Sequence, residues 1–262
     1  MPPILTVPHS RPLQVGTLLG RRKRFLADVR LADGRIVVAH CVNPGRMEGL
    51  VIPDAEVRVS EADPAAKRTL THTLELVRAG KHWVGANTTF ANRIVEELLR
   101  RRLIPGLVRY DELRRECRFG NGSRADFWLR TGRRQRFIEV KNCHLVYPDG
   151  RGYFPDSVSA RASKHLHELS EMVQAGHDAL VLFVVQHTGA DAVRPSDLHD
   201  PEFARAARLA RRAGVRFRAL SVHPSPKGYA VQRLIPVDLR RYSLAAIEPY
   251  RAANDPYSGS AW

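Results

Sequence analysis

The stretch Arg124-Ala-Asp-Phe-Trp-Leu-Arg130, together with Arg136-Phe-Ile-Glu-Val-Lys141, decides how the second half of this chain is expected to fold. The segment Thr131-Gly-Arg-Arg-Gln135 separates the two stretches and contains a glycine, which is typical of the turn of a β-hairpin. The first stretch carries an internal carboxylate, and the second carries a carboxylate and an ammonium group two residues apart. A hairpin would therefore bring acidic and basic side chains of neighbouring strands together.

The period of two along a strand assigns these side chains to faces. Residues two apart share a face, so Glu139 and Lys141 should lie side by side. Ile138 and Val140 would point the other way, into a core. Asp126 would lie across the ladder from Glu139. The pattern thus predicts that two carboxylates and one ammonium group converge.

Two carboxylates at one place suit a hard divalent cation such as Mg²⁺ or Mn²⁺. Such a cation takes oxygen ligands, and proteins usually hold Mg²⁺ with one or two carboxylates, water and substrate phosphate. Asp126 and Glu139 would be the metal ligands, while Lys141 would orient water or neutralise charge on phosphorus. The predicted chemistry is phosphodiester hydrolysis, with these three as catalytic residues. The alternative is an ordinary amphipathic hairpin whose exposed charges pair weakly in water.

The composition favours an acidic polymer as the partner. Lys and Arg number 42 against 27 Asp and Glu, which gives a net charge of +15. Such a surface attracts phosphates, so nucleic acid, DNA or RNA, is the expected partner. Arginines outnumber lysines 36 to six, and the base composition of the source could account for part of this charge. A run of four basic residues, Arg21, Arg22, Lys23 and Arg24, is a candidate for binding nucleic acid. The alternative is that this run is an edge exposed to water.

Several classes of protein are not supported by the sequence. No run of eighteen apolar residues is present, and residues 1–10 lack the pattern of a signal peptide, so a cytoplasmic protein without membrane association is expected. The three cysteines have neither the number nor the spacing of a disulfide frame or a zinc site. Gly120-Asn-Gly-Ser-Arg-Ala125 resembles a dinucleotide motif by letter, but it leads into a predicted strand.

The length of 262 residues fits two domains of moderate size. In residues 1–85, short strands with few helices predict a small β-barrel. These strands are Phe25–Leu31, Arg35–Cys41, Glu56–Ser60, Leu74–Ala79 and His82–Val84. In residues 86–239, strands alternate with helices, which predicts an α/β domain whose sheet is flanked by helices. The predicted elements are a helix over Asn92–Arg101, the hairpin, a helix from Ser159 to Gln174, a strand over Ala179–Val185, a helix over Pro201–Ala213, and strands over Val215–Val222 and Tyr229–Pro236. Residues 240–262 are expected to be a weakly ordered tail.

Motifs from both halves resemble the sugar fermentation stimulation protein A (SfsA) family. They are Arg22-Lys-Arg-Phe-Leu-Ala-Asp28, Cys41-Val-Asn-Pro-Gly-Arg-Met47, Asn87-Thr-Thr-Phe-Ala-Asn-Arg93, Arg124-Ala-Asp-Phe127, Ile138-Glu-Val-Lys-Asn142, Gly152-Tyr-Phe-Pro-Asp156 and Lys164-His-Leu-His-Glu-Leu169. The resemblance implies a DNA-binding protein with an N-terminal OB-like β-barrel. It also implies a C-terminal domain of the PD-(D/E)xK type, a restriction-endonuclease-like mixed sheet flanked by helices. In the first signature of this type, a proline precedes the aspartate. Here Ala125 precedes Asp126, and only the Asp126 carboxylate would take part in the chemistry.

The resemblance also points to further site residues. Nucleases of this type often take a metal-binding carboxylate from the preceding helix, where Glu97 fits better than Glu96. The alternative is a pair of solvated helix charges bound to arginines four residues later. Glu116 is a weaker candidate of the same kind. For contacts with nucleic acid, the candidates are Arg46, Arg161, Lys164 and His165.

A rival hypothesis retains DNA binding but assigns no phosphodiester hydrolysis to the chain. On this view the chain is a non-catalytic DNA-binding regulator of sugar (maltose) metabolism, as the family name suggests. The sequence leaves open the strand preference, endonuclease or exonuclease action, and whether the chain forms a homo-oligomer.

Overall fold

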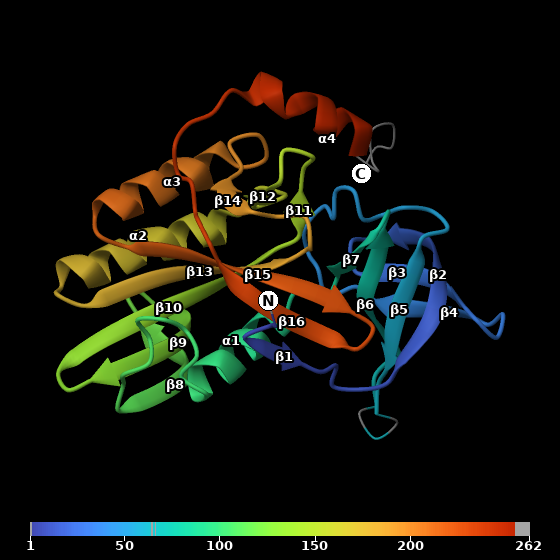
Figure 1. Ribbon diagram of the computed structural model, residues 1–262, viewed down its shortest axis with the longest axis horizontal. Coiled ribbons are helices and arrows are strands. Elements are labelled where there is room, and N and C mark those ends of the chain that lie inside the picture. Colours follow the sequence, from blue (N-terminus) through green and yellow to red (C-terminus); the bar gives the residue numbers. More distant parts are fainter. Residues whose placement is uncertain (1, 64, 66, 255–262) are drawn as a thin grey trace.

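The computed structural model describes residues 2–63, 65 and 67–254, which form a barrel beside a larger sheet covered by helices (Figure 1). Helices α2 and α3 lie over one face of the larger sheet, and α1 packs on the opposite face. The barrel has its own hydrophobic core. The predicted combination of an OB-like β-barrel and a mixed sheet flanked by helices is confirmed.

The barrel sheet has six strands, of which five close the barrel in the order β4-β3-β2-β5-β6, while β7 extends the sheet from β6. They are β2 (Leu13–Arg22), β3 (Leu26–Leu31), β4 (Ile36–His40), β5 (Glu56–Glu61), β6 (His72–Ala79) and β7 (His82–Gly85). A parallel pairing of β4 with β6 closes the sheet on itself. Gly16 is required where β2 passes β3, because a Cβ atom there would lie 2.5 Å from Val29 Cγ1.

The larger sheet has seven strands in the order β1-β16-β15-β13-β10-β9-β8. They are β1 (Leu5–Val7), β16 (Gly228–Ile235), β15 (Arg216–Ser225), β13 (Asp178–Gln186), β10 (Arg134–Cys143), β9 (Ser123–Thr131) and β8 (Glu112–Phe119). The predicted hairpin forms, with Ile138 of β10 opposite Phe127 of β9. Strand β13 pairs in parallel with β10 and β15, and its apolar run is buried on both faces, as is typical of a central parallel strand.

Three helices flank the larger sheet. They are α1 (Phe90–Arg100), α2 (Ala160–Gln174) and α3 (Pro201–Arg212). The Ser159 side chain accepts a hydrogen bond from the Ala162 amide, and Asp200 does the same for Phe203, so each residue caps the helix that follows it. The three helices begin and end within about two residues of the predicted positions, as is usual for helix boundaries.

Both ends of the chain differ from the sequence-based expectation. Strand β1 pairs with β16, so residues 5–7 belong to the larger sheet and not to the barrel. The tail expected from residue 240 instead contains a short 3-10 helix, Leu244–Ala246, and α4, Glu248–Asn254. Ile247 is buried against Tyr147 and Tyr153, and this apolar contact orders the segment. The rest of the expected tail, residues 255–262, lies outside the described residues.

A small third sheet was also absent from the sequence-based expectation. It contains β11 (Leu145–Val146), β12 (Arg151–Phe154) and β14 (Ala192–Pro195). The strands have only two to four residues, which is too short for a periodic pattern to be recognised.

Asp156 connects the barrel to the larger domain. Its Oδ2 atom accepts a hydrogen bond of 2.8 Å from the Met47 amide and lies 3.2 Å from His144 Nε2. Burial by itself would raise the pKa of Asp156, but the charge and hydrogen bond of His144 outweigh it and lower the pKa to about 2. A Cβ atom on Gly45 would lie 2.2 Å from Asp156 Oδ1, so the loop approaches this carboxylate as closely as a glycine allows.

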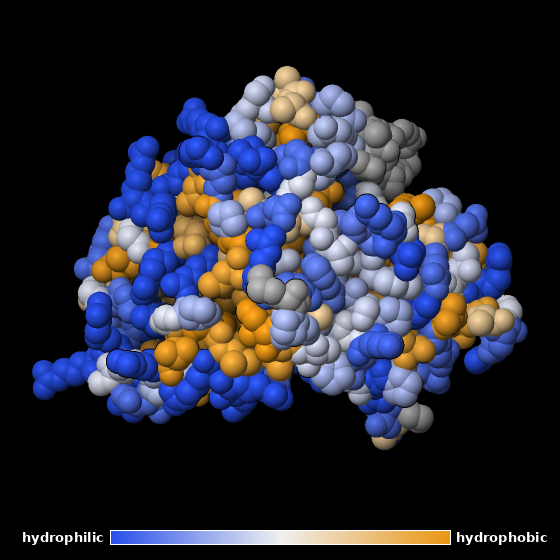
Figure 2. All heavy atoms as spheres, in the orientation of Figure 1, coloured by the Kyte–Doolittle hydropathy of each residue, from blue (hydrophilic) through white to orange (hydrophobic). Residues whose placement is uncertain are grey.

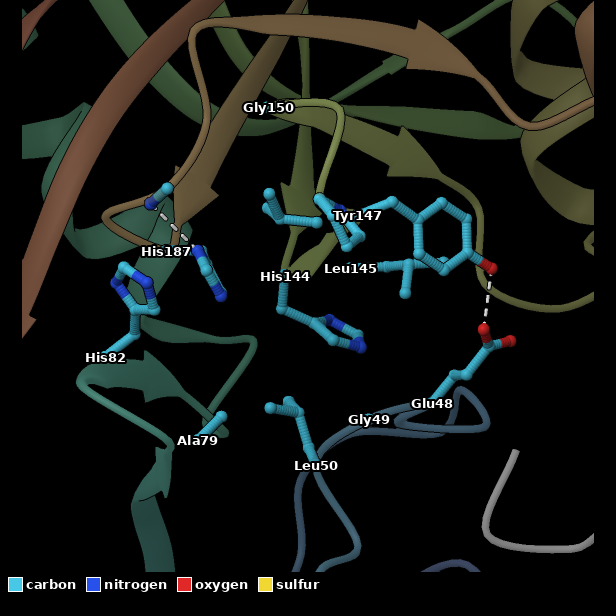
Figure 3. Close-up of a pocket in the computed structure, with 13 residues that line it drawn as sticks. Glu48, Gly49, Leu50, Ala79, His82, His144, Leu145, Tyr147, Gly150 and His187 are labelled. Carbon is cyan, nitrogen blue, oxygen red and sulfur yellow. Dashed lines mark hydrogen bonds between the residues drawn. The ribbon is translucent and has the colours of Figure 1, made fainter. Parts of the chain in front are cut away.

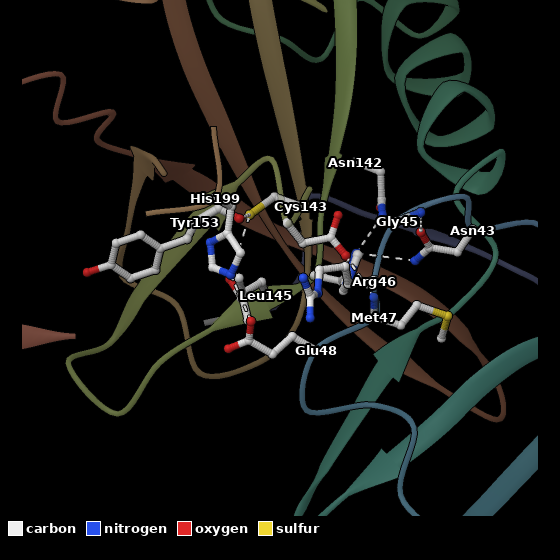
Figure 4. Close-up of polar contacts among 12 residues, drawn as sticks. Asn43, Gly45, Arg46, Met47, Glu48, Asn142, Cys143, Leu145, Tyr153 and His199 are labelled. Atoms are coloured by element: carbon white, nitrogen blue, oxygen red, sulfur yellow. Dashed lines mark hydrogen bonds and ion pairs between the residues drawn. The ribbon is translucent and has the colours of Figure 1, made fainter. Parts of the chain in front are cut away.

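Glu48 makes a second buried connection between the domains (Figure 4). Its Oε1 atom accepts a hydrogen bond of 2.6 Å from the Tyr147 hydroxyl, and its Oε2 atom lies 2.7 Å from His199 Nε2. The other ring nitrogen of His199 lies 2.6 Å from Ser196 Oγ. These contacts satisfy a carboxylate that is 2% exposed, and they hold the barrel loop in one position.

Substitution of Asp156 by Asn should destabilise the protein substantially. The change removes the charge that pairs with His144 and places an amide group near the Met47 amide. Loss of one partner of a buried pair costs about 3–5 kcal/mol, so the free energy of unfolding measured by urea titration should fall by that amount. Asp33→Asn is the matched control, because Asp33 forms an exposed pair with Arg35 and its loss should change stability little. An unchanged urea midpoint for Asp156→Asn would contradict this account of the junction.

Candidate active site

Strands β9 and β10 bring Asp126 and Glu139 together, as the hairpin pattern predicted. The register pairs Phe127 with Ile138, so Asp126 and Glu139 occupy the next position along the ladder. On the other side of β9, the pairing with β8 omits Asp126 at an irregularity where Glu116 has a φ of 50°. Asp126 therefore lies at a break in the ladder, where its side chain turns toward β10.

The Asp126 carboxylate has two fixed hydrogen-bond donors. Its Oδ2 atom accepts a bond of 2.7 Å from the Val140 amide, and its Oδ1 atom accepts one of 2.9 Å from Asn92 Nδ2. Burial and then the negative charge of Glu139 raise the pKa of Asp126 to about 6, although both hydrogen bonds act in the opposite direction. The carboxylate is thus held in one orientation beside a like charge.

The Glu139 carboxylate is bound on one oxygen only. Its Oε1 atom accepts a hydrogen bond of 2.6 Å from Lys141 Nζ and lies 2.7 Å from His165 Nδ1. Burial would raise the pKa of Glu139, but the positive charge of Lys141 and the hydrogen bond from His165 outweigh it and lower the pKa. Its Oε2 atom is buried and has no hydrogen-bond partner among the described residues. One ligand atom on an ionised carboxylate is therefore left available.

Helix α2 supplies His165 to the site in a role that differs from the expected phosphate contact. The side chain is 4% exposed and binds Glu139. Arg161 Nε donates to His165 Nε2 at 3.4 Å, and the Arg161 side chain is exposed. Lys164 is 59% exposed and lies 3.7 Å from Glu168. Arg161 and Lys164 thus lie at the edge of the site, whereas His165 lies inside it.

Helix α1 contributes Asn92 and not the glutamates suggested by the resemblance. Glu97 binds Arg101 at 3.2 Å, four residues later, as the alternative hypothesis expected. Glu96 binds two arginines, Arg100 at 2.8 Å and Arg115 at 2.7 Å. The third acidic candidate, Glu116, is exposed at the irregularity of β8. Asn92 belongs to one of the motifs of the resemblance, but a neutral amide is not recognisable as a site residue by charge.

The donor atoms of the site fit a hard divalent cation. Within the described part of the chain, no group of three or more His, Cys, Asp or Glu side chains is arranged to hold a metal ion. Asp126 and Glu139 would therefore supply two carboxylate ligands, with water and substrate phosphate supplying the others, as is usual for Mg²⁺. A cation would relieve the repulsion between the two carboxylates and bind the free Glu139 oxygen.

The basic run of the barrel divides into a structural part and an exposed part. Arg21 donates to the carbonyls of Asn43 and Gly45 at 2.7 and 2.9 Å, and to the Arg46 carbonyl at 3.1 Å. Its guanidinium therefore holds the loop that carries Arg46.

The remaining basic residues of this run lie at the β2–β3 turn. Arg22 forms an exposed pair with Asp28 at 2.9 Å. Lys23 and Arg24 have φ values of 51° and 60°, which shape the tight turn. Arg24 lines a cavity that also contains Lys141. The turn thus brings one arginine of the barrel to the side of the candidate site.

The outer surface is consistent with the charged composition. Figure 2 shows hydrophilic residues over much of the visible face, while apolar residues gather nearer its centre. Among residues 2–63, 65 and 67–254, none of the helices combines the length and apolar character that a membrane span requires.

A second cavity at the domain junction has a different chemistry (Figure 3). It has a volume of about 360 Å³, and His82, His144 and His187 turn toward it. Burial lowers the pKa of His187 to about 4, and burial also lowers the pKa of His82. These two imidazoles are therefore neutral at pH 7, and Glu48 in this lining is bound to Tyr147. The cavity beside Lys141 is the better candidate for a phosphate-bearing ligand.

Comparison with known proteins agrees with the two-domain architecture. Residues 19–86 match the family model described as the SfsA N-terminal OB domain, and residues 89–228 match the one described as the sugar fermentation stimulation protein RE domain. The solved structure of Pyrococcus furiosus SfsA in complex with Ca²⁺ is similar with a TM-score of 0.80, covering 91% of this chain and 100% of that chain. At 24% identity, this likeness shows the fold alone.

Curated relatives match at higher identity. The sugar fermentation stimulation protein homolog of Thioalkalivibrio sulfidiphilus is 46% identical over 226 residues, which cover 86% of this chain and 95% of that protein. The homolog of Brucella anthropi is 43% identical over 228 residues, which cover 87% of this chain and 98% of that protein. The resemblance seen in the sequence motifs is confirmed, and the chain belongs to the sugar fermentation stimulation protein (SfsA) family.

Proposed function

We propose that this chain binds nucleic acid and hydrolyses its phosphodiester bonds with the help of Mg²⁺ or Mn²⁺. The observation that carries the proposal is the half-buried Asp126 held next to the buried Glu139 and Lys141. Two carboxylates held next to each other and partly shielded from water are unfavourable unless a positive charge joins them, as the raised pKa of Asp126 indicates. Perturbed carboxylates of this kind concentrate at functional sites.

The surrounding residues have separate tasks in the proposed reaction. When bound, the cation would act as a Lewis acid on the phosphate and lower the pKa of a coordinated water. Asn92 and the Val140 amide orient Asp126, while His165 holds Glu139 from helix α2. Lys141 keeps Glu139 ionised and also lines the adjacent cavity, where its ammonium group can neutralise charge on the phosphate.

Two further observations support the choice of cation and substrate. The Pyrococcus furiosus SfsA structure is a complex with Ca²⁺, a hard cation that takes oxygen ligands like those of Mg²⁺. The net charge of +15 and the OB-like barrel suit a polyanionic strand, because such barrels grip nucleic acid through basic and aromatic groups. We propose DNA as the preferred polymer, with RNA as the alternative.

One observation favours the rival function, a non-catalytic DNA-binding regulator of sugar metabolism. Lys141 already neutralises Glu139, and His165 binds the same carboxylate oxygen, without a metal ion. Such a site could persist as a stable charge network in a protein that only binds DNA. The two functions differ in whether any metal-dependent product forms.

Glu139→Gln and Lys141→Met should each reduce cleavage at least about 100-fold, because the first removes the charge of a metal ligand and the second removes the cation beside the reacting phosphate. The assay uses labelled single-stranded and double-stranded DNA and RNA with Mg²⁺, Mn²⁺ or EDTA. Glu202→Gln is the control, since Glu202 forms an exposed pair with Arg205 on α3 and should leave cleavage unchanged. Binding of DNA with no cleavage of any substrate by the wild type would favour the regulator.

The response to metal ions should depend on the ionisation of Asp126. Below pH 6 the carboxyl is protonated and binds cations poorly, so the rise in melting temperature on adding Mn²⁺ should grow as the pH increases through about 6. In Asp126→Asn this pH-dependent rise should be lost. A rise in melting temperature that is equal at pH 5 and pH 7.5 would contradict metal binding by Asp126.

The same carboxyl should affect stability without metal. Its pKa is raised in the folded state from an ordinary 3.8 to about 6, so protonation favours folding. Its contribution is fully present below pH 3.8 and is lost as the pH rises through 6. The free energy of unfolding of the wild type relative to Asp126→Asn, measured by urea titration in EDTA, should therefore decrease between about pH 4 and pH 7. A pH-independent difference would show that Asp126 has an ordinary pKa.

A further inference from the structure

A cavity of about 500 Å³ opens beside Lys141, between the barrel and the larger domain. One wall is the barrel loop of residues 43–45 together with Arg24, and another is the start of α1. The end of β10 and the loop of residues 154–159 complete the lining. The cavity therefore begins at the residues of β10 that directly follow Glu139. Its walls come from both domains, so it forms only where the two domains are joined.

The lining is polar but mostly uncharged. It contains the amide side chains of Asn43, Asn92 and Asn142, together with several hydroxyl groups. Among the residues that line the cavity, Lys141 is the lysine and Arg24 is the arginine. The Asp156 carboxylate in the lining is already paired with His144. A pocket for a phosphate alone would be expected to concentrate cations. This lining instead suits a ligand that has a neutral ring with hydrogen-bonding edges. The side chains of Lys141 and Arg24 would then bind the phosphates of that ligand.

Asn142 provides a specific acceptor in this lining. Its Nδ2 atom lies 3.4 Å from His144 Nδ1, and its Oδ1 atom is buried with no hydrogen-bond partner among the described residues. Figure 4 shows Asn142 and Asn43 on the same side of the junction, away from Tyr153 and His199. An unsatisfied buried acceptor costs about 1–3 kcal/mol, so a ligand that donates an N–H group would recover that energy once the Asn142 amide turns toward the cavity. The exocyclic amino groups of nucleobases are such donors.

The size of the cavity limits what can enter. Small-molecule sites have volumes of roughly 300–1,000 Å³, and 500 Å³ is suited to one nucleotide and not to a stacked duplex. A base in a continuous duplex would have to leave its stack to reach Asn142, at a cost of a few kcal/mol. A base that is already unpaired avoids most of that cost. Val158, which is 78% exposed, lies at this cavity and offers an apolar contact to the base or sugar.

We infer that this cavity binds one unpaired nucleotide of the strand that is cleaved, next to the scissile phosphate. The preferred substrate is then a single strand, or a duplex with an unpaired base, and not continuous duplex. The placement of the scissile phosphate rests on the proposed function, whereas nucleotide binding in the cavity can be measured without any cleavage.

The test uses the full chain in EDTA with one oligonucleotide sequence that carries 2-aminopurine. The oligonucleotide is presented as a single strand, as a duplex in which 2-aminopurine is unpaired, and as a continuous duplex. We expect at least tenfold tighter binding of the first two forms by anisotropy of a distal dye. Entry of the base into the cavity should also change its fluorescence in a manner that saturates with protein.

Two substitutions at one lining position provide matched variants. Ser157→Trp fills the cavity and should reduce the preference for unpaired bases at least tenfold, while Ser157→Ala should retain it. Melting temperature and the salt dependence of duplex binding should be the same in both variants, which excludes misfolding and a general loss of charge attraction. A second variant, Asn142→Leu, should weaken binding of an oligonucleotide with 2-aminopurine more than that of one with an abasic position.

The outcomes separate this inference from the proposed function. Equal affinity for single strand and continuous duplex, or equal behaviour of Ser157→Trp and Ser157→Ala, would overturn the nucleotide site even if the protein cleaves DNA. Selective binding of unpaired bases that is lost in Ser157→Trp supports the site. If that selectivity occurs without any metal-dependent cleavage, hydrolysis is rejected and the nucleotide site is retained.

Discussion

Burial of charged side chains is the constraint on which this structure depends. A buried carboxylate is tolerated only when it is paired or hydrogen-bonded, and Glu48, Asp156, Glu139 and Asp126 each satisfy this requirement in a different way. At the domain junction, both carboxylates are fully occupied, so they hold the barrel loop in place. At the candidate site, the carboxylates repel each other and one oxygen stays unbound. The same constraint therefore produces a junction held by buried contacts and a pair of carboxylates suited to the proposed cation.

Strand β10 connects these two regions. Glu139 and Lys141 lie in its middle, Asn142 lines the cavity, and His144 follows directly after its end and binds Asp156. The parallel pairing with β13 covers residues 136–143, so this part of the strand is supported by a buried neighbour. A ligand in the cavity would contact both domains, because the barrel loop forms the opposite wall. The proposed chemistry and the proposed choice of substrate thus depend on adjacent residues of one strand.

Much of this arrangement could be predicted from local patterns. Alternation along β9 and β10 placed Asp126, Glu139 and Lys141 together because a hairpin leaves little freedom in register. Helix caps and apolar periodicity likewise located α1, α2 and α3. The prediction for α1 rested on charge, however, and did not include Asn92. Charge drew attention to Glu97, which binds Arg101 on the helix surface, whereas Asn92 reaches Asp126. The first turn of α1 packs beside β10, and only that packing makes the amide a site residue.

By itself, the sequence determined the three main helices and most strands of the two larger sheets, the convergence of Asp126 with Glu139 and Lys141, and the basic character of the chain. These features follow from residues that are close along the chain or paired across one turn. The tertiary structure decided which residues more distant in sequence meet them. His165 comes to Glu139 from 26 positions away, and Met47 to Asp156 from 109 positions away. Such contacts depend on how helices and domains pack, and local periodicity carries no information about that packing.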